Sequence, residues 1–471
     1  MKSSSIGLVD QERGMEQKRK EATEIVRILQ GKGFTAYFAG GCVRDSIRGQ
    51  APLDYDIATS AHPDQVKKVF EKTRPVGAHF GVMLVFKGAY AFEVATFRNE
   101  GSYSDGRHPD SVEFSSPQED AMRRDFTING LFENPITGEI IDYVGGKKDI
   151  TQKVIRAIGD PHKRFNEDHL RLLRAVRFSA RLAYHIDEHT LSALKKSVSN
   201  NDLKKISAER IRDEFSLMML DKNRLVAFDL LVETGLIKSI IPEILDLKGC
   251  EQPPQFHPEG DVFIHTRMMV EEYGKSEPPP DIKPLQVILS ILLHDIAKPS
   301  TFSYDDSEDR IRFNGHDKAG AEMTDVILRR LKYPNSTIEA VSSIVENHMA
   351  FKDVQHMRVA KLKRFMGRET YPDEMELHRI DCLCSWGGLD NYEFLMTKQE
   401  EFANEPIIPQ PLINGHDLMN RGVTPGPRIG AILRDVQDLQ LEGIIKERNT
   451  ALQWLDDHLD KGEIIPDQQQ K

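Results

Sequence analysis

Two aspartates in the segment Asp54-Tyr55-Asp56 have a spacing that suits metal-assisted phosphoryl transfer. Residues two apart in a β-strand face the same side, so both carboxylates would point in one direction. Mg²⁺ prefers carboxylate and phosphate oxygens, and a two-metal site can activate a hydroxyl while it stabilises leaving pyrophosphate. An isolated Asp-x-Asp is more often a solvent-exposed loop. The metal-site interpretation therefore depends on the neighbouring segments.

A glycine pair precedes these aspartates in the segment Gly40-Gly41-Cys42-Val43-Arg44-Asp45, after a strand-like run and before an expected helix. Backbone N–H groups and the Arg44 side chain at such a point could hold a triphosphate, although a plain turn is the commoner use of two glycines. Glu93 lies among strand-forming residues, where a carboxylate is unexpected. It is either a third acidic group of the site or an ordinary outward-facing residue.

Two further segments carry groups that could bind a nucleotide. Arg124 and Asp125, followed by Asn129, offer a guanidinium for phosphate and a carboxylate and amide for ribose hydroxyls. A capped helix start on the surface is the alternative for this segment. The second of these segments, Glu167 to Ala183, is predicted to be one helix. On it, Asp168, Arg171 and Arg174 form a stripe, with Arg177 at its edge.

The pair Asp168 and Arg171 could select bases. Cytosine and adenine each present an amino donor beside a ring-nitrogen acceptor, whereas guanine and uracil present the reverse order. An aspartate acceptor next to an arginine donor therefore fits C and A only. The alternative is a solvent-facing ion pair of the kind found on many helices.

Together these motifs resemble the class II tRNA nucleotidyltransferase and poly(A) polymerase family, which carries Gly-Gly-x-x-Arg-Asp, Asp-x-Asp, Arg-Arg-Asp and Glu-Asp-x-x-Arg in this order. The resemblance implies an α+β fold, with a polymerase-β-type nucleotidyltransferase head followed by an all-α neck, HD domain and tail. It also implies roles residue by residue: triphosphate contacts from Gly41 and Arg44, Mg²⁺ binding by Asp54 and Asp56, sugar-phosphate contacts from Arg124 and Asp125, and base reading by Asp168 and Arg171, supported by Arg174 and Arg177.

The activity implied by the resemblance is template-independent addition of C and A, from CTP and ATP, to the acceptor end of tRNA with release of pyrophosphate. A poly(A) polymerase, an enzyme that adds only A or only CC, and an inactive RNA-binding module remain alternatives. In this family, a polar loop such as residues 98–114 is associated with the switch from CTP to ATP.

A second set of metal-binding residues lies further along the chain, and its order resembles that of the HD phosphohydrolase superfamily. Imidazole and carboxylate ligands suit Mn, Ni, Co or Fe, although a single histidine is more often structural or exposed. Lys298, four residues after the second histidine, could bind a substrate phosphate or cap a helix. The six candidate ligands of this HD site are His265, His294, Asp295, His316, His348 and Asp381.

The elements that must position these residues change in type along the chain. Apolar runs at 34–38 and 81–86 predict strands, 63–70 predicts a helix, and long amphipathic helices follow from about residue 160. We predict a polar extension at 1–20, the head at 21–160, a helical neck at 161–255, the HD domain at 256–390 and a helical tail at 391–471.

Composition limits the classes of function. The chain has 471 residues and a net charge of −11, so RNA contacts must use local basic patches rather than a basic average. Four cysteines do not form a disulfide framework. With no membrane span or signal peptide in the sequence, we expect a cytoplasmic protein without a membrane partner.

Overall fold

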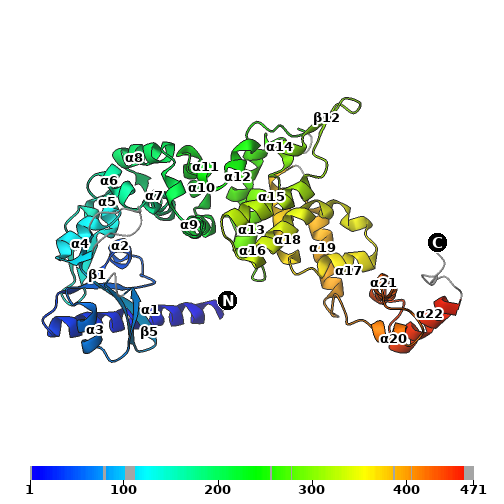
Figure 1. The fold of residues 1–471 in the computed structure, drawn as a ribbon, viewed down its shortest axis with the longest axis horizontal. Helices are drawn as coiled ribbons and strands as arrows, with labels where there is room; N and C mark the ends of the chain where they lie inside the picture. The colour runs from blue at the N-terminus through cyan, green and yellow to red at the C-terminus, as the bar shows by residue number, and fades with distance from the viewer. Residues whose placement is uncertain are drawn as a thin grey trace. The chain divides into compact units, whose positions relative to one another are not determined.

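The computed structural model describes residues 3–77, 81–100, 112–254, 257–276, 278–385, 388–404 and 406–460. The chain forms two compact units, the first made of Met1–Pro242 with Arg330–Lys332 and the second of Glu243–Arg329 with Tyr333–Lys471 (Figure 1). The five-part division predicted above is finer than this and stays a prediction. Across the described ranges, no helix is both long enough and apolar enough to span a bilayer.

The first unit begins with an α+β head, as predicted. Its seven-stranded sheet is antiparallel except where β2 pairs with β5. The predicted strands at 34–38 and 81–86 are confirmed as β1 and β4, and the predicted helix at 63–70 is α3 (Pro63–Val69). In spatial order the strands are β3 (Thr73–Gly77), β4 (Val82–Lys87), β5 (Tyr90–Thr96), β2 (Asp56–Thr59), β1 (Ala36–Ala39), β8 (Leu131–Asn134) and β9 (Glu139–Asp142).

Short elements at the edges of this sheet carry the chemistry-bearing segments. The long helix α1 (Ser3–Gly31) contacts β1, β2, β4 and β5. The pair β6 (Arg98–Glu100) and β7 (Val112–Phe114) flanks residues 101–111, so most of the predicted loop at 98–114 lies outside the described residues. The remaining short elements are α2 (Gly41–Ile47), α4 (Pro117–Arg123), the 3₁₀-helix η2 (Thr127–Asn129) and α5 (Gly146–Gln152).

Helices complete the first unit, and one of them differs from the prediction. The predicted helix over 167–183 is two helices, α6 (Pro161–Glu167) and α7 (Leu170–Leu182), separated at Asp168, whose backbone is extended at φ −142°. Asp168 is the C-cap of α6, and its side chain accepts a hydrogen bond from the N–H of Leu170, the first residue of α7. The prediction that Asp168, Arg171 and Arg174 lie on one helix is therefore wrong for Asp168, while Arg171 and Arg174 both lie on α7. The helices α9 (Ala208–Leu220) and α10 (Arg224–Glu233) pack against α7.

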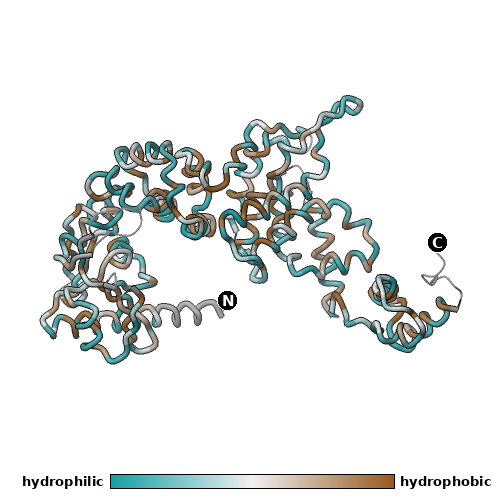
Figure 2. The backbone as a smooth tube through the Cα atoms, viewed as in Figure 1, coloured by the Kyte–Doolittle hydropathy of each residue, from teal (hydrophilic) through white to brown (hydrophobic). Residues whose placement is uncertain are grey.

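The second unit is a helical bundle around α13 (Pro284–Leu293), which is buried along most of its length and brown in Figure 2. Around it pack α12 (Val262–Glu272), α16 (Asn335–Asn347) and α18 (Tyr371–Cys384). Next to them lie α15 (His316–Arg330), the 3₁₀-helix η5 (His348–His356) and the hairpin of β12 (Ser303–Asp305) and β13 (Arg310–Arg312).

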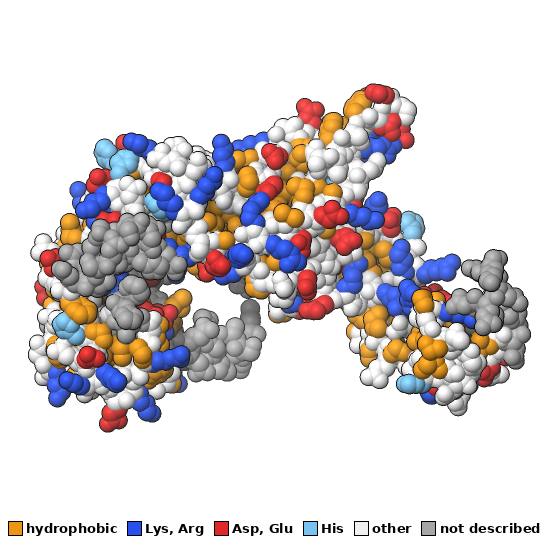
Figure 3. All heavy atoms as spheres, viewed as in Figure 1, with side chains coloured by type: hydrophobic (Ala, Val, Ile, Leu, Met, Phe, Trp, Pro, Cys, Tyr) orange, Lys and Arg blue, Asp and Glu red, His pale blue; other side chains and the backbone are white. Residues whose placement is uncertain are grey.

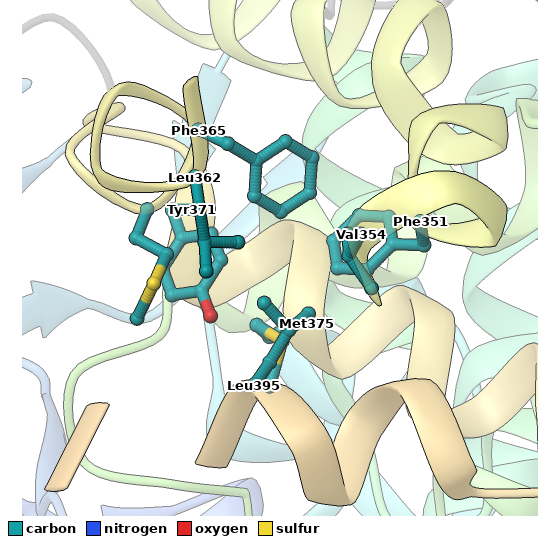
Figure 4. Packing of buried hydrophobic residues seen from close by; sticks show 8 residues of the cluster. Phe351, Val354, Leu362, Phe365, Tyr371, Met375 and Leu395 are labelled. Atoms are coloured by element: carbon teal, nitrogen blue, oxygen red, sulfur yellow. The ribbon is translucent and has the colours of Figure 1, made fainter. Parts of the chain in front are cut away.

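Further apolar clusters continue the second unit towards the C-terminus. In Figure 4, side chains from η5, α17 (Val359–Met366), α18 and α19 (Asp390–Phe402) interlock around Phe351, Tyr371 and Leu395. A separate cluster joins α20 (Gly415–Met419), α21 (Pro427–Leu441) and α22 (Arg448–Asp460). On the face drawn in Figure 3, blue lysine and arginine side chains are interspersed with red acidic ones.

Candidate functional site

A cavity of about 500 Å³ in the first unit collects most of the nucleotide-binding residues predicted from the sequence. The predicted residues that line it are Gly40, Gly41, Arg44, Asp56, Arg124, Asp125, Asn129, Asp168, Arg171 and Arg174. A second cavity of about 520 Å³ shares Gly41, Arg44 and Asp56 and adds Asp45 and Asp54. Asp56 therefore lies between two spaces, each large enough to hold part of a nucleotide.

The two aspartates do not project from one strand as predicted. Asp56 begins β2, but Asp54 lies before the strand, where its side chain is 81% exposed and pairs with Lys18 Nζ at 2.5 Å. The short strand begins two residues later than the spacing suggested. Both carboxylates nevertheless line the 520 Å³ cavity.

Glu93 lies beside Asp56, because β2 and β5 are parallel with Ile57 opposite Val94. Burial, followed by the negative charge of Glu93, raises the pKa of Asp56 to about 6. A divalent cation at this point would offset both effects, since it stabilises the ionised carboxylates. The donor set of Asp54, Asp56 and Glu93 thus fits a hard cation such as Mg²⁺.

The glycine turn approaches the Arg-Arg-Asp segment closely. Gly40 has φ +74°, and a Cβ built on it would lie 2.9 Å from Arg124 Nη1, so a larger residue would be strained and crowded. Arg44 donates to both carboxylate oxygens of Asp45 at 2.9 Å and to Asn129 Oδ1 at 2.8 Å. Asp45 therefore orients Arg44 at the wall shared by the two cavities.

Asp125 is buried and joins the head to α7. Arg174 donates to its Oδ2 from Nη2 at 2.6 Å and Nε at 2.8 Å, and Asn129 donates to its Oδ1 at 3.1 Å. Burial opposes the charged form, but the positive charge of Arg174 and the hydrogen bonds from Asn129 and Arg174 together outweigh it and lower the pKa of Asp125 to about 2. Arg177 instead donates to Glu214 on α9 at 2.6 Å, so it supports the helix pair and does not line the 500 Å³ cavity.

The predicted base readers both line the 500 Å³ cavity, each held by a residue that sequence reasoning had not placed there. Asp168 Oδ2 accepts from Arg210 Nη2 at 2.9 Å. Arg171 Nη1 donates to Glu167 Oε2 at 2.7 Å, and its Nη2 donates to the Arg123 carbonyl at 3.0 Å. The four-residue spacing of Glu167 and Arg171 could have indicated their pair. No local spacing indicates Arg210, which lies 42 residues after Asp168.

In the second unit, all six predicted ligands of the HD site come together. Asp381 Oδ1 lies 3.1 Å from His265 Nε2, and Asp295 Oδ2 lies 3.1 Å from His294 Nε2. Asp295 Oδ1 lies 3.5 Å from His316 Nε2, which is 3.1 Å from His348 Nε2. Two clusters suited to a metal therefore adjoin, one of His265, His294 and Asp381 and the other of Asp295, His316 and His348.

The orientation of the four histidines fits metal binding. The Nδ1 atoms of His294, His316 and His348 lie 2.6–3.0 Å from backbone carbonyls, so their Nε2 atoms face the cluster. The buried Nε2 atoms of His265 and His294 lie 3.1 Å from carboxylate oxygens of Asp381 and Asp295, yet neither is oriented to form a hydrogen bond with any described residue. Burial, together with His294, lowers the pKa of His348 to about 4, which keeps it neutral as a ligand must be.

One acidic neighbour of the HD ligands, Glu259, was missed from the sequence, whereas Lys298 had been named there. Glu259 Oε1 lies 2.8 Å from the Nδ1 atoms of both His257 and His265, and it orients the latter ring. Lys298 lies 2.7 Å from Asp295 Oδ2 and donates to Gln252 Oε1 at 2.7 Å. A cavity of about 510 Å³ is lined by His257, by Lys298 and by the predicted ligands His294, Asp295, His316, His348 and Asp381. His257 and Glu259 lie in a Pro-rich segment, and their spacing there did not indicate that they would lie beside a metal site.

Comparison with known proteins gives matches along both units. Three families match: "Poly A polymerase head domain" at residues 36–156, "Probable RNA and SrmB- binding site of polymerase A" at 183–247, and "HD domain" at 261–385. The CCA-adding enzyme of Lactobacillus gasseri is 31% identical over 438 residues, 92% of this chain and 95% of its own length.

Two further comparisons agree. The match to the CCA-adding enzyme of Enterococcus faecalis is 47% identical over 206 residues, 44% of this chain, and spans about half (50%) of that relative. The crystal structure of the Bacillus stearothermophilus CCA-adding enzyme in complex with CTP superposes with a TM-score of 0.71 at 25% identity, covering 94% of this chain and 98% of that one.

Proposed function

Because this chain belongs to the CCA-adding enzyme family, we propose that it adds C and A, from CTP and ATP, to the 3′ end of tRNA without a nucleic-acid template. One observation carries the proposal: Asp56 and the pair Asp168 and Arg171 line the same cavity. The carboxylate that would hold the metal at the reacting phosphate and the groups that read a base thus act on one nucleotide. We also predict that the protein is located in the cytoplasm.

The residues of the chain divide the work of transfer. Arg44 and the Gly40-Gly41 turn hold the triphosphate, while Asn129, oriented by Asp125, meets the ribose hydroxyls. The tRNA 3′-hydroxyl attacks the α-phosphorus, and pyrophosphate leaves. Asp54 and Asp56, with Glu93 beside them, would hold Mg²⁺, which when bound would supply Lewis-acid stabilisation of the charge that develops. Asp168 accepts from the amino group of C or A, and Arg171 donates to the adjacent ring nitrogen.

Transfer assays on three tRNA transcripts, ending before CCA, after C and after CC, test this function with each nucleotide offered separately. We expect stepwise addition of C, C and A, and no efficient addition of U or G. Asp56→Asn should abolish addition, whereas the matched control Asp64→Asn, an exposed aspartate of α3, should not. Long runs of A would indicate a poly(A) polymerase, and efficient use of UTP or GTP would contradict the proposed base readers.

The second unit favours a second activity, hydrolysis of phosphoesters by the HD site. The inward-facing Nε2 atoms and the two adjoining clusters support it. A transition metal such as Mn, Ni, Co or Fe would supply hydroxide at neutral pH by lowering the pKa of a bound water. Asp295 belongs to one cluster and contacts His294 of the other, so it would help to hold a metal at either position. Lys298 lies within reach of a substrate phosphate at the edge of the cavity.

The test of this second activity offers a 2′,3′-cyclic nucleotide with Mn²⁺, Ni²⁺, Co²⁺ or Mg²⁺ to the wild type and to a double variant, His294→Ala with Asp295→Ala. Hydrolysis should be lost in the double variant while addition of C and A persists. If the wild type shows neither hydrolysis with any metal nor metal in the purified protein, the six residues are a structural remnant.

A further inference from the structure

The carboxylate of Asp168 is held from two sides, although the residue lies in an extended break between two helices. Oδ1 accepts from the Leu170 N–H at 3.0 Å, and Oδ2 accepts from Arg210 Nη2 at 2.9 Å. A carboxylate oxygen can accept two hydrogen bonds, so each retains a lone pair for the base. The two contacts together define the plane of the carboxylate.

Arg210 reaches Asp168 from a different helix. It lies in the first turn of α9, which packs against α7, and its side chain is 23% exposed in the pair. Four residues further on the same face of α9, Glu214 accepts from Arg177 of α7. The pair of Arg177 and Glu214 joins α7 to α9, and the pair of Asp168 and Arg210 joins the break before α7 to the same helix, so the Arg210 guanidinium lies beside a residue that lines the cavity.

Reading a base by two side chains requires a fixed relation between the acceptor and the donor. Arg171 is already restrained by Glu167 and by the carbonyls of Arg164 and Arg123. Without Arg210, Asp168 would keep only its contact with Leu170, and its Oδ2 could turn away from the position that faces an amino group. The site would then lose affinity for C and A, which need that acceptor, more than for U and G, which do not.

We propose that Arg210 is a positioning residue for nucleotide selection: it orients the Asp168 carboxylate toward the exocyclic amino group of C and A. The inference rests on the proposed addition of C and A. Arg210 itself contacts neither the base nor the phosphates; it acts through Asp168. A purely structural role in joining α7 to α9 would lower addition of every nucleotide together, so selectivity separates the two explanations.

The experiment measures kcat and KM for CTP and UTP, on tRNA ending before CCA, in wild type, Arg210→Gln and Arg210→Lys. We expect Arg210→Gln to lower the ratio of kcat/KM for CTP over UTP by about tenfold or more, mainly through KM for CTP, because one charge-assisted hydrogen bond is lost. Lysine keeps the charge but not the planar fork, so Arg210→Lys should give an intermediate ratio.

A control variant, Lys195→Gln, removes an exposed ion pair with Glu233 from α8 (Glu188–Ser199) and should keep the wild-type ratio. An unchanged ratio in both Arg210 variants, or equal losses for CTP and UTP, would overturn the inference. If Arg210→Gln fails to fold, Arg210→Lys decides alone, and a wild-type ratio overturns the inference. A wild type that uses UTP as well as CTP would instead contradict the proposed function, whatever the variants do.

Discussion

At the scale of single residues, the first unit depends on buried carboxylates that are paired rather than free. Asp125 is 8% exposed and accepts four hydrogen bonds, two from Arg174, one from Asn129 and one from the Phe126 N–H. A buried charge is tolerated only when it is satisfied in this way. These four contacts fill the acceptor positions of the carboxylate, so they stabilise the fold and orient Asn129 and Arg174 at the nucleotide cavity.

Asp125→Asn should destabilise the protein in a pH-dependent manner. A pKa of about 2 in the folded state, below the usual value of about 4, means that the charged group contributes stability above pH 4. That contribution, roughly 2–3 kcal/mol, is lost as the pH falls through 2. Urea unfolding from pH 7 to 2 should show a large difference between variant and wild type at pH 5–7 that shrinks towards pH 2. A difference independent of pH would contradict this account.

At the scale of elements, the site depends on a close approach between α5 and η2. A Cβ built on Gly146, the first residue of α5, would lie 2.2 Å from the carbonyl oxygen of Thr127 and 3.0 Å from Leu131 Cγ. Because the opposing atom is backbone, no side-chain rotation can relieve the clash. η2 carries Asn129, which touches both Arg44 and Asp125. A shift of η2 would therefore reach the nucleotide cavity.

Gly146→Ala should cost roughly 1–3 kcal/mol of stability and reduce addition of C and A, because η2 must move. Gly31→Ala is the matched control: Gly31 ends α1, and a Cβ there meets no atom within 4 Å. Alanine is also the better helix former, so the control should be neutral or slightly stabilising. Thermal unfolding and transfer assays on both variants check this. If both variants had the same unfolding temperature and the same transfer rate, the close approach of α5 and η2 would not matter for stability or for the nucleotide cavity.

At the scale of the whole molecule, each compact unit carries its own centre and its own buried core. The nucleotide cavity belongs to the first unit, and the HD ligands belong to the second. A ligand that binds only one folded unit raises the stability of that unit by mass action. The two centres should therefore respond separately to metal.

Adding Mn²⁺ to metal-free protein should raise the temperature of one calorimetric transition, that of the second unit, and removing it with a chelator should reverse the shift. His348→Asn should weaken the shift, because it deletes a ligand of the cluster with Asp295 and His316. His416→Asn, at an exposed histidine of α20, is the matched control. A shift that persists unchanged in His348→Asn would place the metal elsewhere.

The sequence by itself determined the α+β head, the helical remainder and most of the residues around each centre. Motifs such as Gly40-Gly41 and Asp54-x-Asp56 can be recognised in the sequence because their residues are close together in the chain and because few residue types can bind phosphate or a metal. The six HD ligands could be predicted because their order along the chain resembles that of a known superfamily. In both units, the structure brings the predicted residues of each centre close together.

The tertiary structure alone decided how those residues are held. Asp54 lies outside β2 and Asp168 outside α7, because strand and helix ends depend on packing and capping that residue spacing does not encode. Arg210 and Glu259 take part only through the folding of segments that are separate in sequence. A hydrogen bond between residues 42 positions apart cannot be predicted from the periodicity of the sequence. Composition and spacing can name the groups that do chemistry, but only packing decides which neighbours orient them.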